Sequence, residues 1–351
     1  MDAVSRRMWL GGAGAAVATS MVPANLFAQD ADARLLGHVA PEFREAAKAL
    51  IQMDGQRPPF SRETLPAIRK GGDAYVQPPL DAPAWQERVI AGPEDTRLRL
   101  FVINASPGAS KPAILHTHGG GYITGSAKSD IRYLQAIAQR LDCVIVTVDY
   151  RLAPETTWRG SVEDNHAGLK WLYDNAAAIG ADRARIAVMG ESAGGGHAAL
   201  LALAARDRGE VPLVFQCLVY PMLDDRTGTR VIPPNPVGEL LWTGEANRFG
   251  WEAFLGMPPG TGSVPLAAVP ARRMDLAGLP PAWIGVGGID LFVDEDVDYA
   301  QRLLAAGVPT QLLVIPGAFH GFYIMLPQAP LSRQFYESML AALARAFGMA
   351  V

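Results

Sequence analysis

Short apolar runs that alternate with helix-patterned segments limit the fold of this chain more than any other feature. Such runs, bounded by turn residues, are typical of strands buried on both faces, and the segments between them repeat apolar residues at helical spacing. Strands are expected at 112–120, 143–150, 185–190, 213–221, 282–288 and 310–317, and helices at 129–142, about 161–179, 193–208, 294–306 and in the last segment to about 347. This order predicts an α/β fold, with a mostly parallel central sheet and helices on both faces.

Two segments before this series carry a different pattern. Residues 85–91 and 96–104 alternate apolar and polar side chains, which is typical of half-buried antiparallel strands. We therefore expect an antiparallel pair at the start of the sheet.

The chain divides into a core and two additions. Residues 226–270 interrupt the strand–helix alternation and keep several large apolar side chains, so they are predicted to form a partly helical lid between two strands. Residues 29–80 hold one helical pattern followed by scattered prolines, which predicts an N-terminal cap segment without a core of its own. The α/β core is then formed by residues 81–225 and 271–351.

A twin-arginine export signal is predicted for residues 1–28. Arg6 and Arg7 precede a short stretch rich in glycine and alanine, and a cleavage point follows Ala28. Trp9 stands where this kind of signal usually has Phe. The signal predicts a periplasmic or secreted protein, and the alternative is a cytoplasmic protein with a disordered tail. The apolar stretch is too short and too rich in glycine to predict a membrane span.

Composition restricts the partners of the chain. Its 351 residues are 49% hydrophobic, its net charge is -4, and no basic stripe predicts binding to nucleic acid. Cys143 and Cys217 lie within apolar runs and are predicted to be buried thiols, and no cysteine cluster has zinc spacing. We expect no metal, no organic cofactor and no nucleic-acid partner.

The strongest local signal is the turn Gly190-Glu191-Ser192-Ala193-Gly194. It follows the strand at 185–190 and opens the helix at 193, and glycines let the backbone turn sharply there. A G-x-S-x-G turn between a strand and a helix exposes the serine hydroxyl at the top of the sheet. Ser192 is therefore the predicted nucleophile.

A glycine-rich loop follows the strand at 112–117. It reads His118-Gly119-Gly120-Gly121-Tyr122, and three glycines let backbone N–H groups approach a substrate oxygen closely. Such a loop is typical of an oxyanion hole, which stabilises a tetrahedral intermediate.

A base and an acid are expected downstream of Ser192. His320 lies in a loop after the last strand, where it would meet the nucleophile, and Asp290 follows the preceding strand, where it would orient the imidazole. His197 sits on the helix behind Ser192 and is predicted to be structural. Asp294 is the alternative acid, although it fits the acidic first turn of a helix better.

The motifs together resemble the hormone-sensitive-lipase-like family of α/β-hydrolases, which includes bacterial esterases. The matching pieces occur in family order: HGGGY at 118, DYRLAPE at 149, GESAGG at 190, and Asp290 with HGF at 320. The resemblance covers about 85–345 and implies an α/β-hydrolase fold. It also implies roles for single residues: the triad Ser192, Asp290 and His320, oxyanion donors on the N–H groups of Gly120, Gly121 and Ala193, and scaffolding by His118, Asp149, Arg151, Glu155 and Asp224.

Two positions depart from the family pattern. Leu291 stands where the family commonly has proline after the acid, and Glu191 stands where it often has aspartate before the serine. Neither departure removes a catalytic atom.

The predicted activity is hydrolysis of short-chain or small aryl carboxylic esters through an acyl-enzyme. Tyr122, Trp242, Phe322 and Tyr323 either line the substrate pocket or pack the lid. An amidase, a lactonase, a carbohydrate deacetylase and a non-catalytic binding protein on the same scaffold remain as alternatives. A homodimer is compatible with the resemblance.

Overall fold

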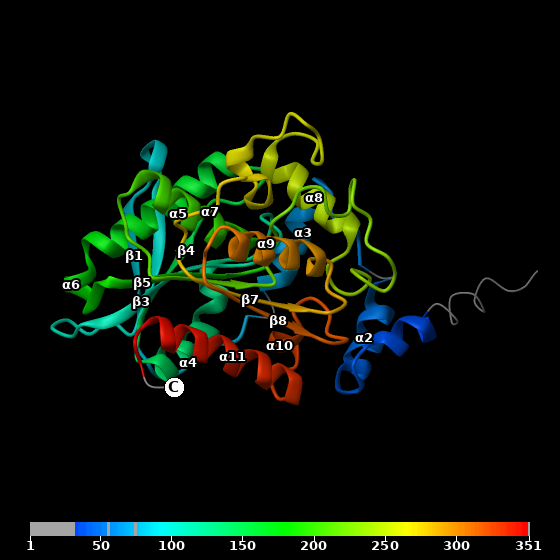
Figure 1. Ribbon diagram of the computed structural model, residues 1–351, viewed down its shortest axis with the longest axis horizontal. Helices are drawn as coiled ribbons and strands as arrows, with labels where there is room; N and C mark the ends of the chain where they lie inside the picture. Colours follow the sequence, from blue (N-terminus) through cyan, green and yellow to red (C-terminus); the bar gives the residue numbers. More distant parts are fainter. Residues whose placement is uncertain (1–31, 55–56, 74–75, 350–351) are drawn as a thin grey trace, which may run out of the picture.

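A sheet of eight strands forms the centre of the molecule (Figure 1). The computed structural model describes residues 32–54, 57–73 and 76–349. The strand order is β1-β2-β4-β3-β5-β6-β7-β8, in which the pairs β1–β2 and β2–β4 are antiparallel and the others parallel. The strands are β1 Trp85–Ala91, β2 Arg97–Ile103, β3 Lys111–Thr117, β4 Val144–Asp149, β5 Ala181–Glu191, β6 Phe215–Val219, β7 Ala282–Gly287 and β8 Thr310–Ile315. This confirms the predicted mostly parallel sheet and its antiparallel start.

Helices cover both faces of the sheet, as predicted (Figure 1). The helices α5, α7 and α9 pack on one face, and α4 and α11 pack on the other. The α-helices are α2 Arg44–Asp54, α3 Leu65–Asp73, α4 Ile131–Leu141, α5 Trp158–Asp174, α6 Ala176–Ile179, α7 Ala193–Arg208, α8 Gly244–Leu255, α9 Val293–Ala305, α10 Phe322–Met325 and α11 Pro330–Ala346. The short 3-10 helices are η1 Pro41–Phe43, η2 Pro93–Asp95, η3 Ala127–Asp130, η4 Leu266–Ala268 and η5 Pro270–Arg272.

The apolar runs are explained by burial on both faces of the sheet. In β5, Ile186 and Val188 point into the core on the α7 side, whereas Met189 points into the core on the α4 and α11 side. Because both faces are covered, no position in the middle of the strand favours a polar side chain. Cys143 and Cys217 are buried free thiols in the same core, as predicted.

Some element bounds differ from the sequence prediction. Residues 29–80 were expected to hold one helix followed by scattered prolines, but one of these, Pro66, lies in the first turn of a second helix, α3, where a missing N–H breaks no helical hydrogen bond. The helix expected at about 161–179 is divided at Asn175 into α5 and α6. The strand expected at 213–221 is shorter, Phe215–Val219, because the chain turns away at Tyr220 with a positive φ of 33°.

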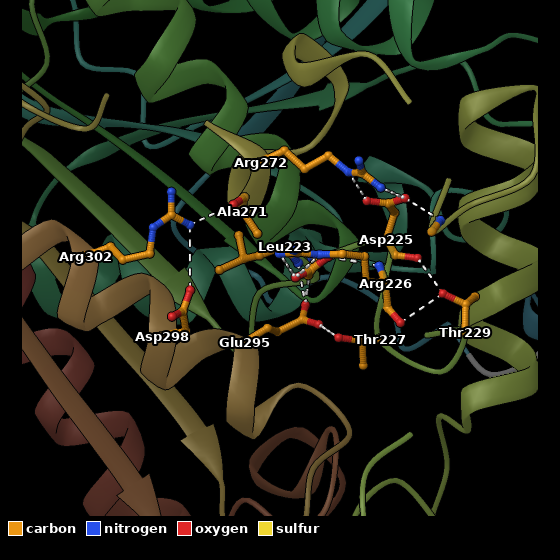
Figure 2. A network of polar contacts seen from close by, with 12 residues as sticks. Leu223, Asp225, Arg226, Thr227, Thr229, Ala271, Arg272, Glu295, Asp298 and Arg302 are labelled. Carbon is orange, nitrogen blue, oxygen red and sulfur yellow. Dashed lines mark hydrogen bonds and ion pairs between the residues drawn. The ribbon is translucent and has the colours of Figure 1, made fainter. Parts of the chain in front are cut away.

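The segment between β6 and β7 contains α8 and is closed at its base by a buried ion pair (Figure 2). The Asp225 carboxylate accepts hydrogen bonds from Nε of Arg272 at 2.6 Å and from its Nη2 at 2.8 Å. The N–H of Gly260 donates to the same carboxylate at 2.6 Å. These contacts join both ends of the predicted lid, so we call them, together with Glu295, the lid-base network.

Glu295 on α9 completes the lid-base network (Figure 2). One of its carboxylate oxygens accepts from the N–H of Leu223 at 2.6 Å and of Asp224 at 3.1 Å, and the other accepts from the hydroxyl of Thr227. Burial first, and then the charge of Asp224, raise the pKa of Glu295 well above its usual range. The lid base is thereby attached to the helix that follows Asp290.

The N-terminal segment packs against the segment that was predicted to form a lid. The Phe60 ring stacks on Phe249 of α8 at 6.3 Å and lies 5.7 Å from the Trp242 ring. Arg69 of α3 donates to the carbonyl of Ile123 at 2.7 Å and pairs with Glu155.

The predicted export signal lies outside the described residues. Within the part that is described, no helix is both long and apolar enough to cross a membrane.

Candidate active site

Ser192 lies at a sharp turn between β5 and α7. Its backbone has φ 56° and ψ −122°, a region that non-glycine residues rarely adopt and that stores strain. A Cβ at Gly190 would lie 2.4 Å from the carbonyl oxygen of Gly194, and one at Gly194 would lie 2.0 Å from that of Thr117. Glycine is therefore required on both sides of the serine, as the motif predicted.

The turn is fixed by hydrogen bonds to the neighbouring strand. The N–H of Ser192 donates to the carbonyl of Val219 at 2.9 Å, and its own carbonyl accepts from the N–H of Met222 at 2.9 Å. The strained conformation persists because the surrounding backbone determines it at both ends.

His320 lies between Ser192 and Asp290. Its Nε2 is 3.0 Å from Oγ of Ser192, and its Nδ1 is 2.8 Å from Oδ2 of Asp290. When Nδ1–H donates to the carboxylate, Nε2 is free to accept the serine proton. The other carboxylate oxygen of Asp290 accepts from the N–H of Phe292 at 3.0 Å. The structure thus brings the three sequence-predicted residues together.

Packing and strand position explain why this imidazole is well oriented. Asp290 follows β7 and His320 follows β8, so both reach the carboxyl edge of the sheet where Ser192 lies. The His320 ring packs against Tyr220, 4.6 Å away between centroids, and edge-on against Phe292 at 5.2 Å. Asp294, the alternative acid, lies in the first turn of α9.

The glycine-rich loop lies beside Ser192. Gly120 and Gly121 have φ values of +117° and +60°. A Cβ at Gly120 would lie 2.2 Å from the carbonyl oxygen of Thr124, and one at Gly121 would lie 2.1 Å from the Trp242 ring. Only glycine fits these two positions. Ala193, the third predicted donor, is the first residue of α7, where N–H groups have no partner within the helix.

Stacking and hydrogen bonds hold the start of this loop. The His118 ring stacks on Tyr150 with centroids 4.1 Å apart, and its Nδ1 lies 2.8 Å from the carbonyl oxygen of Gly119. The Tyr150 hydroxyl donates to the His118 carbonyl at 2.7 Å. Burial lowers the pKa of His118 to about 4, so this ring is neutral in the ordinary pH range.

The other residues assigned to scaffolding form ion pairs. Arg151 pairs with the buried Asp164 at 2.9 Å, and Glu155 pairs with Arg69 at 2.7 Å. Asp149 is paired with an arginine, Arg99, at 2.5 Å. Asp224 pairs with Arg226 at 2.6 Å.

A cavity of about 2000 Å³ opens above Ser192. Two of the predicted pocket residues, Trp242 and Tyr323, line it together with Ser192 and His320. Its wall also contains residues that the sequence reasoning did not select: Phe60, Tyr133, Tyr220 and Leu241. Tyr220 could have been found, because it follows a strand whose carboxyl end faces the site. Phe60 and Tyr133 carry no comparable signal.

Tyr122 and Phe322 do not line this cavity, which corrects the pocket prediction for both. Tyr122 is 1% exposed, stacks on Phe254 of α8 with centroids 3.9 Å apart, and donates its hydroxyl to the Met222 carbonyl at 3.0 Å. Phe322 is fully buried against Phe43 and other aromatic rings. Tyr122 packs against α8 of the predicted lid, which is the second of the two roles that the sequence left open for it.

His197 also lies in this aromatic packing. Its ring contacts Tyr122, Tyr150 and Phe254 edge-on, and burial lowers its pKa to about 3. It has the surroundings of a core side chain, as expected for a structural histidine.

Comparisons with known proteins agree with this geometry. A family model described as the alpha/beta hydrolase fold matches residues 114–324. The chain belongs to the α/β-hydrolase family. Esterase LipI of Mycobacterium tuberculosis is 36% identical over 236 residues, which are 66% of this chain and 72% of the relative. Ethyl acetate hydrolase of Pseudomonas putida is 34% identical over 231 residues, 62% of this chain and 68% of the relative.

Solved α/β-hydrolase structures match most of the chain. A bacterial heroin esterase superposes with a TM-score of 0.80 at 33% identity, covering 89% of this chain and 99% of the other. Esterase LipW of Mycobacterium marinum gives a TM-score of 0.71 at 34% identity, covering 89% and 97%. The resemblance to hormone-sensitive-lipase-like carboxylesterases that the motifs indicated is therefore confirmed.

Proposed function

We propose that this α/β-hydrolase is a serine carboxylesterase that hydrolyses short-chain or small aryl esters through an acyl-enzyme. The observation that carries the proposal is the position of His320, 3.0 Å from the Ser192 hydroxyl and 2.8 Å from the Asp290 carboxylate. A serine, an imidazole and a carboxylate in this order form a nucleophile, a general base and a group that stabilises the charged base.

In the first half-reaction, His320 Nε2 takes the proton of Ser192 as its Oγ attacks the ester carbonyl. Asp290 stabilises the resulting imidazolium, and the N–H groups of Gly120, Gly121 and Ala193 donate to the oxyanion. The intermediate collapses as His320 returns its proton to the alcohol that leaves. Water, deprotonated by His320, then attacks the acyl-enzyme. As this second intermediate collapses, the Ser192 Oγ–acyl bond breaks, His320 returns its proton to Oγ, and the acid is released. These steps require neither a metal nor an organic cofactor.

The preference for a small acyl group rests on Trp242. Its ring lies against Gly121, so it restricts the space beside the oxyanion loop. The wider cavity leaves room for a bulkier alcohol, as in an aryl ester. The relative named ethyl acetate hydrolase agrees with a small acyl group.

Ser192→Ala tests the nucleophile. We expect kcat to fall on the order of 10⁶-fold, because loss of a triad nucleophile leaves only binding and oxyanion stabilisation. The folded state should be retained, which circular dichroism and thermal unfolding would check. An organophosphonate should label the wild-type protein at Ser192 and leave the variant unlabelled. Full activity in the variant contradicts the assignment.

A substrate panel separates the alternatives. Esters of increasing acyl length, anilides, lactones and acetylated sugars would be compared by kcat/KM. The highest value for acetate or propionate esters supports the carboxylesterase proposal. A preference for anilides, lactones or acetylated sugars favours an amidase, a lactonase or a deacetylase, and labelling of Ser192 without any turnover favours a binding protein.

The location and assembly also stay proposals. We propose that residues 1–28 direct export through the twin-arginine pathway to the periplasm or beyond, with a cytoplasmic location as the alternative. Sequencing the N-terminus of the mature protein tests this, because export predicts a start at Gln29.

A homodimer is the proposed assembly, and its mass in solution tests it.

A further inference from the structure

A second histidine–carboxylate pair lies on the other side of Ser192. Glu191, the residue before the nucleophile, is buried, and its Oε2 is 2.8 Å from Nε2 of His116. The other ring nitrogen of His116 is 2.9 Å from the hydroxyl of Thr147. This arrangement connects β4, β3 and β5 beneath the active site through side chains that are all inside the protein.

Asp130 is the third member of what we call the elbow cluster: His116, Asp130 and Glu191. The ligand-type atoms of these residues all lie within 4.8 Å of one another. Asp130 precedes α4, yet its side chain does not cap that helix. Oε1 of Glu191 is buried, and within the described residues it has no hydrogen-bond partner. The cluster therefore has more acceptors than donors, and an additional proton would complete it.

The charges of the cluster favour such a proton. Burial by itself would lower the pKa of His116, but the charge and hydrogen bond of Glu191 outweigh it and the pKa is raised. Burial raises the pKa of Asp130 to about 7, although the charge of His116 opposes this. Groups this close influence one another's titration, so the loss of a proton from Asp130 changes the charge that acts on His116 and Glu191.

Several other titratable groups that face the cluster have pKa values far from neutral. Burial raises the pKa of Cys217 and of four neighbouring tyrosines well above their usual ranges, and burial lowers that of His118 to about 4. The tyrosines are Tyr133 on α4, Tyr150 after β4, Tyr220 after β6 and Tyr323 on α10. Asp130 is the member of the cluster whose pKa lies near 7.

The cluster contacts two parts of the active site at once. Glu191 directly precedes Ser192, and its carbonyl oxygen would be 3.0 Å from a Cβ placed at Gly119 in the oxyanion loop. His116 is two residues before His118, where that loop begins. The residue whose side chain pairs with His116 therefore also has its backbone packed closely against the oxyanion loop.

We propose that His116 and Glu191 are positioning residues that hold the Ser192 turn against the oxyanion loop, with Asp130 as a second proton acceptor that loosens this hold when it ionises. The inference rests on the proposed function, because it concerns the same nucleophile. Protonated Asp130 leaves the His116 ring to Glu191 alone. Ionised Asp130 is a second carboxylate that attracts the same ring, so the positioning weakens as pH rises through about 7.

The first test compares two histidines that each pair with a glutamate. His116→Gln removes the proposed positioning charge. His166→Gln makes the same change at a buried histidine on α5, whose Nε2 is 3.3 Å from the exposed Glu210. The readout is the rate of Ser192 labelling by an organophosphonate, together with kcat and KM for p-nitrophenyl acetate. We expect His116→Gln to lower the labelling rate and kcat by about 10- to 10²-fold with KM little changed, because small misplacements of a nucleophile have effects of this size. His166→Gln should keep wild-type rates.

Three further variants keep the test decisive if His116→Gln does not fold. Glu191→Gln removes the charge and should lower the labelling rate, whereas Glu191→Asp keeps it and should recover part of the rate. For Asp130→Asn, the labelling rate is divided by that of the wild type at each pH. This ratio should be near one at about pH 5.5 and should rise severalfold above about pH 8. The reason is that the carboxyl group of Asp130 ionises in the wild type, whereas the amide of the variant cannot. A ratio independent of pH contradicts the role of Asp130.

Other outcomes overturn the proposal in distinct ways. Wild-type labelling rates in folded His116→Gln and Glu191→Gln show that the cluster has no positioning role. One zinc ion per wild-type chain, lost in His116→Gln and kept in His166→Gln, assigns the cluster to a metal instead. If the wild type labels at Ser192 but hydrolyses no ester, the proposed function fails, and the labelling rates still test the positioning.

Discussion

The lid-base network and the elbow cluster are both built on buried carboxylates, but they differ in how completely those carboxylates are hydrogen-bonded. Asp225 receives two bonds from Arg272 and one from Gly260, and both oxygens of Glu295 accept (Figure 2). In the elbow cluster, one oxygen of Glu191 has no partner among the described residues.

The difference indicates separate uses for buried acids. A fully hydrogen-bonded cluster fixes the backbone segments that it joins, and removing one member leaves another polar group unpaired. An incomplete cluster can gain or lose a proton without breaking its remaining bonds. We therefore expect changes at the lid base to affect mainly stability, and changes in the elbow cluster to affect mainly the rate of reaction at Ser192.

Asp290→Asn should give the largest effect, on kcat. It is an exception to the comparison, because this fully hydrogen-bonded acid is expected to affect the rate rather than stability. Asp290 is as fully bonded as the lid-base acids, but one of its partners is the base His320. An amide there favours the wrong imidazole tautomer, so kcat should fall by about 10⁴-fold with little change in the melting temperature. Steady-state kinetics and thermal unfolding measure the two quantities. A kcat within tenfold of wild type would falsify the role of Asp290.

Asp225→Ala is expected to have the next largest effect, on stability. It leaves the guanidinium of Arg272 buried without its partner, which should lower the free energy of unfolding by about 3–5 kcal/mol. Glu337→Ala is the control, because its partner Arg140 is more than half exposed and such pairs contribute about 1 kcal/mol or less. Urea unfolding at fixed pH measures both. Equal losses in the two variants contradict the importance of burial at the lid base.

Trp242→Ala should have the smallest effect on catalysis, a change in substrate choice. Removing the ring that contacts Gly121 enlarges the space for the acyl chain, so the ratio of kcat/KM for hexanoate to that for acetate should rise about tenfold. Trp242→Phe should give an intermediate ratio. Because the Trp242 side chain is buried, its truncation also destabilises the fold, so the ratio is measured at a temperature where thermal unfolding shows each variant to be folded. An unchanged ratio in both variants shows that this ring does not select the acyl group.

The features that could be predicted from the sequence depend on which elements follow one another along the chain. Ser192 could be assigned because a strand, a glycine-flanked turn and a helix follow one another directly, and His320 and Asp290 because parallel strands end at the same edge of a sheet. The antiparallel start of the sheet was predicted for the same reason, since alternation along β1 and β2 is visible within each strand.

Features that depend on side-chain direction or distant pairing were not predictable. Tyr122 follows the oxyanion glycines, but its positive φ of 67° accompanies a buried side chain under α8 rather than one in the cavity. Phe322 follows His320, yet it begins α10 and is buried against Phe43. The pairing of His116 with Glu191 joins residues 75 positions apart, and it depends on the register of β3 and β5.

The ion pair between Asp225 and Arg272 at the base of the predicted lid also has a consequence for how related α/β-hydrolases could acquire different substrates. Because the two ends of the insertion are joined to each other and to α9, its interior can change in length and sequence while its attachment points stay in place. Exchange of the segment between related enzymes is then a route to new substrate ranges that leaves the triad untouched. The ion pair marks the natural boundaries for such a graft.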